Sequence, residues 1–488
     1  EHKAELIRLL KDHSEEPESI PLLERRAGGH AEFSVSFAQQ RLWFMQQLLP
    51  GNPFYNMPIP LRLRGELDVV ALQACLDALV ARHETLRTTF RTQGETAFQV
   101  IAPPGPVKLG AVDLTAVPEG EREEQARRLV REDGLRAFDL SAGPLIRAQL
   151  LRLSAEDHVL QLTLHHIIAD GWSIPVLFRD LGELYQASCA GRAPQLPALA
   201  IQYADFSVWQ RNWLTGSVLS EQLGYWRERL EGISELQLPT DRPRPALPTH
   251  AGARETLRLS SQLSAALGAV SRRNGATLYM VLLTAFKVLL QRYTRQDDLV
   301  VGSPIANRTR LELEELIGFF VNSLVMRTDA SGDPSFVELL QRVRRVALDA
   351  FAHQDLPFER LVEELDPERD LSRNPLFQVM FVLQNATSDA TLSMSAGLVV
   401  ETFPEAVETI RFDLEVHVWE LVEQLSVDFH YNTDLFDAAT IRRMLGHYER
   451  VLEAVVANPE VRISEVALLD AAERHRLLEE WNRTGAAY

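Results

Sequence analysis

The only adjacent pair of histidines in the chain, His165 and His166, lies in the segment LTLHHIIADGWS, where Asp170 and Gly171 follow. An imidazole with an ordinary pKa of about 6.5 is largely neutral at pH 7 and can accept a proton from a nucleophile. That chemistry suits the formation of an amide or ester from an activated acyl group. Successive side chains on a strand point to opposite faces, so one histidine can face a cavity while its neighbour faces the interior. The pair therefore predicts one catalytic and one structural histidine.

Asp170 and Gly171 stand where a strand is expected to turn into a helix. The Asp170 carboxylate can orient a histidine or form a structural ion pair. Gly171 has no Cβ, so the backbone can bend there or a thin substrate arm can pass close by. The helix that begins after Gly171 would direct backbone N–H groups toward the turn, which favours a developing oxyanion.

Two other interpretations of this segment stay open. Histidines are readily accommodated in partly buried positions, so both could be purely structural. A His-His-Asp zinc site is disfavoured, because adjacent histidines on a strand diverge and no further cluster of His, Cys or Glu is nearby. The sequence contains no GxSxG elbow, Walker A sequence or GxGxxG fingerprint, which weighs against serine hydrolases, P-loop proteins and Rossmann enzymes.

Charge and composition narrow the function classes further. The 488 residues include 50 Lys and Arg against 68 Asp and Glu, a net charge of -18, which disfavours nucleic acids and anionic membranes as partners. The longest apolar stretch, Leu278 to Phe286, is far shorter than the about 18 residues of a membrane-spanning helix. Cys75 and Cys189 each lie in an apolar helical pattern, so no disulfide framework or CxxC site is expected. A cytoplasmic setting fits best.

Paired strands and a helix are expected to position the histidines. Residues 145–153 and 158–166 alternate like neighbouring strands, and a helix that Ser173 could cap follows, with Pro175 in its first turn and Gly191 beyond its end. The second half repeats this mixture without a clean sequence repeat. Its periodicity predicts helices over 260–273, 278–293 and 438–457, and strands over 298–304, 321–328, 376–384, 412–419 and 425–431.

Seven ordered blocks resemble the motifs of condensation domains of nonribosomal peptide synthetases, and the similarity covers nearly the whole chain. The blocks are SFAQQRLWFM from Ser36, RHETLRTTF from Arg82, LHHIIADGWS, YADFSVW from Tyr203, IGFFVNSLVMR from Ile317, HQDLPFE from His353 and RDLSRNPLF from Arg369. Each block also has a plain structural interpretation as core or ion-pair packing, because most invariant apolar positions of a family belong to its core.

The resemblance implies an α/β fold of two chloramphenicol-acetyltransferase-like lobes, which form a V-shaped pseudodimer with a central tunnel. Residues 33–190 would form the N-terminal lobe with the HHxxxDG motif, and 191–469 the C-terminal lobe. Residues 1–32 look like a linker that follows an upstream carrier protein, and 470–488 look like a connector toward an adenylation domain. A monomer is expected, because the two lobes already supply the pseudo-symmetric pairing.

The implied reaction is peptide-bond formation. An upstream donor carrier would deliver an acyl or peptidyl thioester on its phosphopantetheine arm, and a downstream acceptor carrier would deliver an aminoacyl thioester whose α-amine attacks. The domain would bind no cofactor or metal of its own. The resemblance assigns the catalytic motif to His165, His166, Asp170 and Gly171.

Individual roles follow from the same resemblance. His166 would be the general base or would position the α-amine, while His165 is more structural in character and Asp170 would pair with Arg308. Gly171 would line the acceptor entrance. The substrate tunnel is expected to include Trp172, Ser173, Asn322 and Ser323.

Relatives of this family leave alternatives. A starter condensation domain, which acylates the first amino acid, shares most of the motifs. A catalytically silent recruitment domain of the same fold has little reason to keep both histidines, and a stand-alone CoA-dependent acyltransferase is disfavoured by the linker-like ends. Epimerisation domains depart from DGWS, and heterocyclisation domains replace HHxxxDG with DxxxxD. The motifs favour an L-configured donor but do not identify the amino acids joined.

Overall fold

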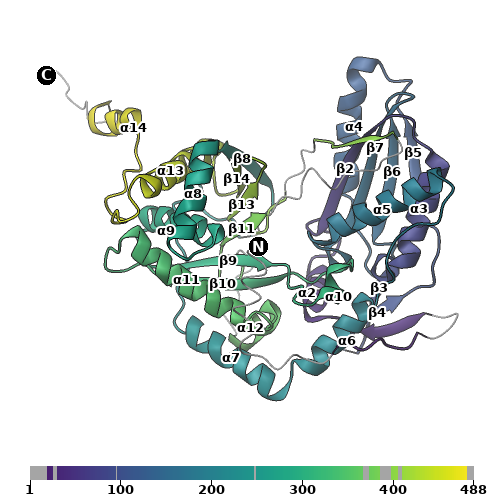
Figure 1. Ribbon diagram of the computed structural model, residues 1–488, viewed down its shortest axis with the longest axis horizontal. Coiled ribbons are helices and arrows are strands. Elements are labelled where there is room, and N and C mark those ends of the chain that lie inside the picture. Colours follow the sequence, from purple (N-terminus) through teal and green to yellow (C-terminus); the bar gives the residue numbers. More distant parts are fainter. Residues whose placement is uncertain are drawn as a thin grey trace.

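Two α/β lobes diverge from a common base, so that the molecule has the shape of a V (Figure 1). The computed structural model describes residues 19–25, 30–94, 96–246, 249–365, 373–384, 397–404 and 409–480. Most of the expected linker over 1–32, the last eight residues of the expected connector, and residues 369–372 of the seventh motif lie outside this description.

The N-terminal lobe is built on a five-stranded sheet with the order β12-β2-β7-β6-β5. Its strands are β2 (Asn56–Arg64), β5 (Leu109–Asp113), β6 (Ile146–Arg152), β7 (Asp157–His165) and β12 (Val399–Thr402). A smaller sheet, β1-β4-β3, comprises β1 (Ala31–Ser34), β3 (Thr88–Gln93) and β4 (Thr96–Ile101). The helices of this lobe are α2 (Phe37–Leu48), α3 (Val69–Arg82), α4 (Glu119–Gly134) and α5 (Ser173–Cys189), with short turns η2 (Glu84–Arg87) and η3 (His166–Ile168).

The central strand β7 carries the histidine motif. Its residues from His158 to His165 are all buried, because β2 and β6 flank it and the lobe's core packs against it. β7 ends at His165, η3 follows at once, and α5 begins at Ser173. The strand-to-helix turn expected from the sequence is therefore present, and it is held by a rigid sheet.

The C-terminal lobe has a six-stranded sheet with the order β10-β9-β11-β13-β14-β8. Its strands are β8 (Gly252–Arg258), β9 (Asp298–Ile305), β10 (Asn322–Asp329), β11 (Val379–Gln384), β13 (Leu414–Glu420) and β14 (Leu425–Asn432). Helices α8 (Ser261–Arg273), α9 (Leu278–Thr294), α11 (Phe336–Ala352) and α13 (Ala438–Ala457) build its core, and α12 (Phe358–Leu365) lies nearer the other lobe. The last helical residues described are α14 (Ala471–His475) and η4 (Arg476–Glu480).

The base of the V connects the lobes through α6 (Tyr203–Trp213), α7 (Gly216–Leu230) and α10 (Leu311–Glu314) (Figure 1). A separate apolar cluster lies there and includes Ile20, Tyr203, Phe206 and Phe320. The lobes are also joined by β12, which falls in the sequence range expected for the C-terminal lobe but pairs antiparallel with β2 of the N-terminal lobe. A simple division at residue 190 does not account for this strand.

The long apolar run of the second half is a core helix. Residues of α9 from Met280 to Leu290 are buried, including Lys287, whose Nζ donates to the carbonyl oxygens of Leu299 (3.2 Å) and Met326. Among the described helices, none is by itself long and apolar enough to cross a membrane; α8 and α9 pass that test only together, bent by 104°. In the same part of the chain, no group of three or more His, Cys, Asp or Glu side chains could hold a metal ion.

Candidate active site

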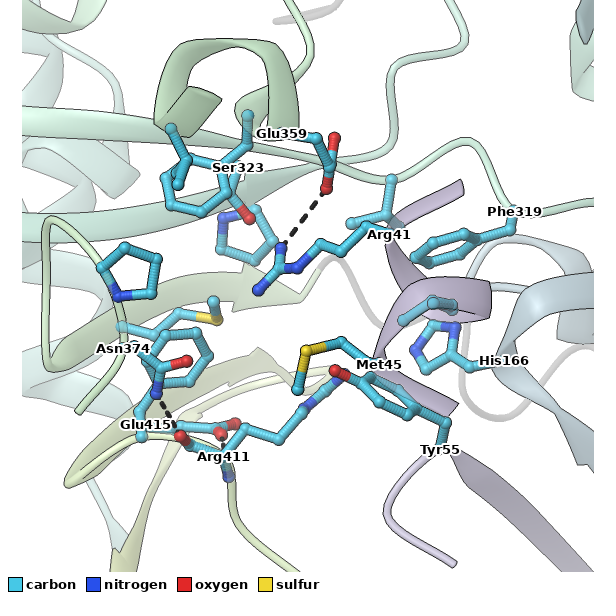
Figure 2. A pocket seen from close by; sticks show the side chains of 18 of the residues that line it. Arg41, Met45, Tyr55, His166, Phe319, Ser323, Glu359, Asn374, Arg411 and Glu415 are labelled. Carbon is cyan, nitrogen blue, oxygen red and sulfur yellow. Dashed lines mark hydrogen bonds and ion pairs between the residues drawn. The ribbon is translucent and has the colours of Figure 1, made fainter. Parts of the chain in front are cut away.

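The space between the two lobes contains a mostly apolar cavity of about 2770 Å³. Side chains of α2 and of the segment from β7 to α5 form one wall, and side chains of β11, α12 and β13 form another. Figure 2 shows His166 and Tyr55 of the N-terminal lobe facing Arg411 and Glu415 of the C-terminal lobe. His166 therefore lies on the wall of a chamber that both lobes build.

The His166 ring is held in one orientation by the backbone around it. Its Nδ1 lies 2.8 Å from the carbonyl oxygen of Ala169. A carbonyl oxygen only accepts, so Nδ1 carries the proton and Nε2 keeps its lone pair. The Phe319 ring packs edge-on with 4.9 Å between centroids, and the backbone N–H of His166 donates to Tyr55 O at 2.7 Å. No described residue hydrogen-bonds to Nε2, which can therefore accept a hydrogen bond from a substrate.

The charge state of His166 follows from its surroundings. Burial and the nearby Arg411 guanidinium lower the pKa of His166 to about 4, although the Asp170 carboxylate acts in the opposite direction. The imidazole is thus neutral at pH 7. A neutral ring with a free Nε2 is a good hydrogen-bond acceptor but a weak base.

His165 points to the opposite side of the motif and does not line the cavity. It is 2% exposed, and its Nδ1 accepts from the backbone N–H of Ile167 at 3.1 Å. Burial, with the neighbouring His166 and Arg147, lowers the pKa of His165 to about 3. Its place in the catalytic motif is consequently that of a neutral packing residue that supports the turn.

Asp170 is the centre of a fully buried polar network, which we call the junction knot: Asp170, Ser173, Arg308 and the backbone of Gly318 and Phe320. Arg308 donates to Asp170 Oδ1 at 3.0 Å, so the ion pair expected from the sequence is present in the structure. The backbone N–H of Phe320 donates to Asp170 Oδ2 at 3.0 Å. Ser173 Oγ donates to Asp170 Oδ1 at 2.7 Å and accepts from the N–H of Gly318 at 3.1 Å. The knot joins the motif to the base of the V.

Two expectations for Ser173 are wrong. It does not cap α5 from outside but is the first residue of that helix, and its own N–H donates to Asp170 Oδ1 at 2.9 Å. It is completely buried and does not line the cavity. The backbone N–H and the hydroxyl of Ser173, at the start of α5, therefore donate to the Asp170 carboxylate. The geometry does not support the oxyanion role expected for this end of the helix.

Asn322 is also misplaced by the prediction, whereas Ser323 does line the cavity. The Asn322 amide donates to the carbonyl oxygens of Gln354 and Leu356, both at 2.9 Å, and its Oδ1 accepts from the N–H of Phe358 at 2.9 Å. Adjacent residues of a strand face opposite ways, so only one of this pair can face the chamber. Asn322 instead fastens the start of α12 to β10.

Gly171 and Trp172 line the cavity as expected. A Cβ at Gly171 would meet no atom within 4 Å, and the backbone there is not left-handed, so the fold itself does not require glycine. Trp172 Nε1 donates to the carbonyl oxygen of Glu314 at 3.2 Å, which ties the turn to α10. The open space beside Gly171 is compatible with passage of a substrate arm.

The structure adds cavity residues that the sequence analysis did not single out. Arg41 of α2 pairs with Glu359 of α12 at 3.3 Å across the chamber, and Tyr55 and Arg411 lie near His166 (Figure 2). Arg41 stands in the first motif and Phe319 in the fifth, so those blocks contained the signal. Arg411 belongs to none of the seven blocks, and its position depends on folding of the second lobe.

Comparison with known proteins assigns the family. Residues 30–478 match the model of the condensation domain. The chain belongs to this family. It is a condensation domain of the nonribosomal peptide synthetase type, with the two-lobed chloramphenicol-acetyltransferase-like fold.

Similar curated proteins are large synthetases. The chain is 51% identical over 451 residues to a component of the linear gramicidin synthase of Brevibacillus parabrevis and 47% identical over 460 residues to chondramide synthase cmdD of Chondromyces crocatus. These matches cover 92% and 94% of the chain but only 6% and 12% of the two relatives. The chain thus corresponds to a small part of each.

Solved structures show the same architecture. The X-domain from teicoplanin biosynthesis superposes with a TM-score of 0.84 and 34% identity, covering 93% of this chain and all of that one. SgcC5 from Streptomyces globisporus gives a TM-score of 0.71 at 30% identity, covering 88% and 100%. A starter condensation domain of rhizomide synthetase, at 22% identity and a TM-score of 0.77, shares the fold.

Proposed function

We propose that this domain forms peptide bonds by transferring an acyl or peptidyl group from a donor carrier thioester to the α-amine of an acceptor aminoacyl thioester. The observation that carries the proposal is His166: a neutral imidazole in the inter-lobe cavity, with Nδ1 fixed on Ala169 O and Nε2 free of any hydrogen bond from the described residues. Nε2 can accept a hydrogen bond from the attacking amine and so fix its direction of approach.

The proton balance follows from the charge state of His166. A free α-amine has a pKa near 8, so a fraction is already unprotonated at neutral pH and needs no strong base. Attack on the thioester carbonyl gives an intermediate with N⁺ and O⁻. Nε2 of His166 accepts a hydrogen bond from that N⁺–H, and the proton passes to the departing thiolate as the C–S bond breaks. The products are the amide on the acceptor and the free thiol of the donor arm.

Partners are part of the same proposal. Upstream and downstream carrier proteins would each insert a phosphopantetheine arm, the acceptor arm passing Gly171 and Trp172. An adjoining adenylation domain would load the acceptor carrier, and the assembly would work in the cytoplasm. The open space at Gly171 supports an entrance on this side.

A recruitment domain is the second candidate, and a specific likeness favours it. The X-domain from teicoplanin biosynthesis has the TM-score of 0.84 given above, and it has been solved in a complex with OxyB. A recruitment domain would bind a tailoring enzyme and would not transfer an acyl group itself. The orientation of His166 and its free Nε2 support the catalytic proposal instead.

Intact-mass spectrometry separates these functions. The protein is mixed with a donor carrier bearing a peptidyl thioester and an acceptor carrier bearing an aminoacyl thioester. We expect the donor mass to appear on the acceptor carrier, and His166→Ala to slow this transfer at least tenfold, in line with the about 10² contributed by acid–base groups. The variant should keep its fold, because His166 lies on the cavity wall, and circular dichroism checks this.

The controls address the alternatives. Exposed His475, in α14, supplies a matched variant, His475→Ala, that should transfer at the wild-type rate. Transfer from a fatty acyl-CoA but from no peptidyl carrier would identify a starter domain. Carrier binding without transfer by the wild-type protein, across several substrate pairs, would contradict the proposal and favour recruitment.

A further inference from the structure

Arg411 approaches the reaction chamber from the C-terminal lobe, in the loop just before β13, opposite His166. Figure 2 shows its side chain extending into the cavity toward Tyr55 and Met45. The Arg411 Cζ lies 5.6 Å from the centroid of the Tyr55 ring. Tyr55 also accepts the backbone N–H of His166 through its carbonyl oxygen at 2.7 Å. One residue of the N-terminal lobe thus contacts both His166 and Arg411.

The Arg411 guanidinium differs from the other arginines of the cavity wall. The others are all paired: Arg41 with Glu359, Arg179 with Glu315, Arg244 with Asp413, and Arg373 with Glu235. Within the described part of the chain, no carboxylate lies at ion-pair distance from the Arg411 guanidinium, and no side chain or carbonyl accepts a hydrogen bond from it. The charge of Arg411 nevertheless acts on His166, because it helps to lower the pKa of that imidazole. Arg411 is exposed, so its guanidinium, which is unpaired among the described residues, is accessible to a ligand that enters the cavity.

The backbone that carries Arg411 is firmly anchored. Its N–H donates to Glu415 Oε1 at 3.4 Å, and its carbonyl oxygen accepts from Asn374 Nδ2. On either side, the N–H of Ile410 donates to His250 O at 3.0 Å and the N–H of Asp413 donates to Gln378 O at 2.9 Å. The backbone from which the Arg411 side chain extends is therefore held in place, which a preorganised charge requires.

Glu415 helps to hold the backbone of Arg411 but makes no direct ion pair with the Arg411 guanidinium. Burial alone would raise the pKa of the Glu415 carboxyl, but the hydrogen bond from His417 and the charge of Arg411 lower it to about 2. The carboxylate is therefore ionised. Its two nearest donors, His417 Nε2 at 3.3 Å and the N–H of Arg411 at 3.4 Å, leave the guanidinium of Arg411 directed elsewhere.

We infer that Arg411 is a catalytic residue that binds the oxyanion of the tetrahedral intermediate, while His166 accepts a hydrogen bond from the nitrogen of that intermediate. This inference rests on the proposed peptide-bond formation. When the amine attacks, the C–N bond forms and the carbonyl π electrons move to oxygen, which becomes O⁻. When the C–S bond breaks, the electron pair on oxygen re-forms the C=O bond and the thiolate leaves. The thiolate takes up the proton that the nitrogen loses.

The distribution of charge in the chamber matches this intermediate better than it matches the reactants. The thioester and the neutral amine carry no formal charge, so an unpaired cation gains little from them. The intermediate has O⁻ and N⁺ on adjacent substituents of one carbon. A guanidinium from one lobe and a neutral imidazole from the other complement these two sites, and stabilisation that appears only at this stage accelerates the reaction.

Single-turnover transfer between the two loaded carriers tests the inference. We expect Arg411→Ala to lower the transfer rate about 10²- to 10³-fold, the effect of removing one oxyanion donor. The dependence of the rate on carrier concentration should stay as in the wild type. Arg411→Lys, which keeps the charge but not the planar fork, should lie between the two. Millimolar guanidinium chloride, well below denaturing concentrations, should partly restore Arg411→Ala but not His166→Ala.

Arg442→Ala is the matched control, because this exposed arginine of α13 pairs with Glu255 far from the chamber and its loss removes the same charge. An Arg411→Ala rate close to that of the control would overturn the inference. A change confined to the dependence of the rate on carrier concentration would also overturn it. So would a slow Arg411→Ala variant that guanidinium does not rescue, if Arg411→Lys is equally slow. No transfer by the wild-type protein with any substrate pair would instead contradict the proposed function itself.

Discussion

His166 of the reaction chamber and Asp170 of the junction knot belong to the same motif, but their polar atoms differ in how they are paired. Both oxygens of Asp170 are hydrogen-bonded, and Arg308 and Ser173 are enclosed with it. In the chamber, Nε2 of His166 and the guanidinium of Arg411 have no hydrogen-bond partner among the described residues. The difference separates residues that hold the lobes in place from residues that are kept for a substrate.

The largest effect is expected from breaking the knot. Asp170→Ala removes the carboxylate while Arg308 stays buried, and removing one partner of a buried pair typically costs about 3–5 kcal/mol. Denaturant unfolding followed by circular dichroism should show this loss. The control is Glu255→Ala, which breaks the exposed pair with Arg442 and should cost less than about 1 kcal/mol. Equal losses for the two variants would remove the distinction between knot and surface.

A smaller effect, on activity alone, is expected at the chamber entrance. Gly171→Leu places a side chain in open space, so the unfolding free energy should hardly change. If the acceptor arm passes here, acceptor-dependent transfer should fall about tenfold or more, since misplacement of a reactant is costly. Binding of the donor carrier, measured by calorimetry, should be unaffected. If this variant transfers at the wild-type rate, the acceptor arm takes another route.

The smallest effect is a pH dependence of stability that comes from the burial of His165. The pKa of His165 is lowered to about 3 in the folded state, whereas an unfolded histidine has a pKa of about 6.5. Below about pH 6.5 the unfolded state binds more protons, so this residue's contribution to stability falls by up to about 1.4 kcal/mol for each pH unit. His165→Asn should flatten the decline in unfolding free energy between about pH 6.5 and 5. An unchanged slope would show that His165 is not buried as a neutral ring.

The elements around the motif could be predicted because their signals are local. The alternation of residues 145–153 and 158–166 gave the paired strands β6 and β7, and the change of period after Gly171 gave α5. The cap of α5 could not be assigned from residue type alone: Asp170 and Ser173 are both good capping residues, yet the N-cap position is Trp172, and Arg308 hydrogen-bonds to both Asp170 and Ser173.

Contacts between the lobes could not be predicted from the sequence, for a different reason. β12 is a four-residue strand whose partner β2 stands more than three hundred residues earlier, so no periodic pattern marks it. Arg411 likewise lies in a loop without a motif, and it becomes relevant only when the second lobe folds against the first. Asn322 is the exception: strand alternation alone would have separated it from Ser323.

The pairing of β12 with β2 also has a consequence for the long carrier arms of the proposed reaction. The lobes are joined at the base, and the pairing of Val399–Thr402 with Leu61–Arg64 adds a second connection, because β12 comes from the sequence range of the C-terminal lobe. In the proposed function, a substrate arm would have to pass this second connection to reach His166. In the proposed reaction, the lengthened peptide would have to be drawn out through the opening by which the acceptor arm came in.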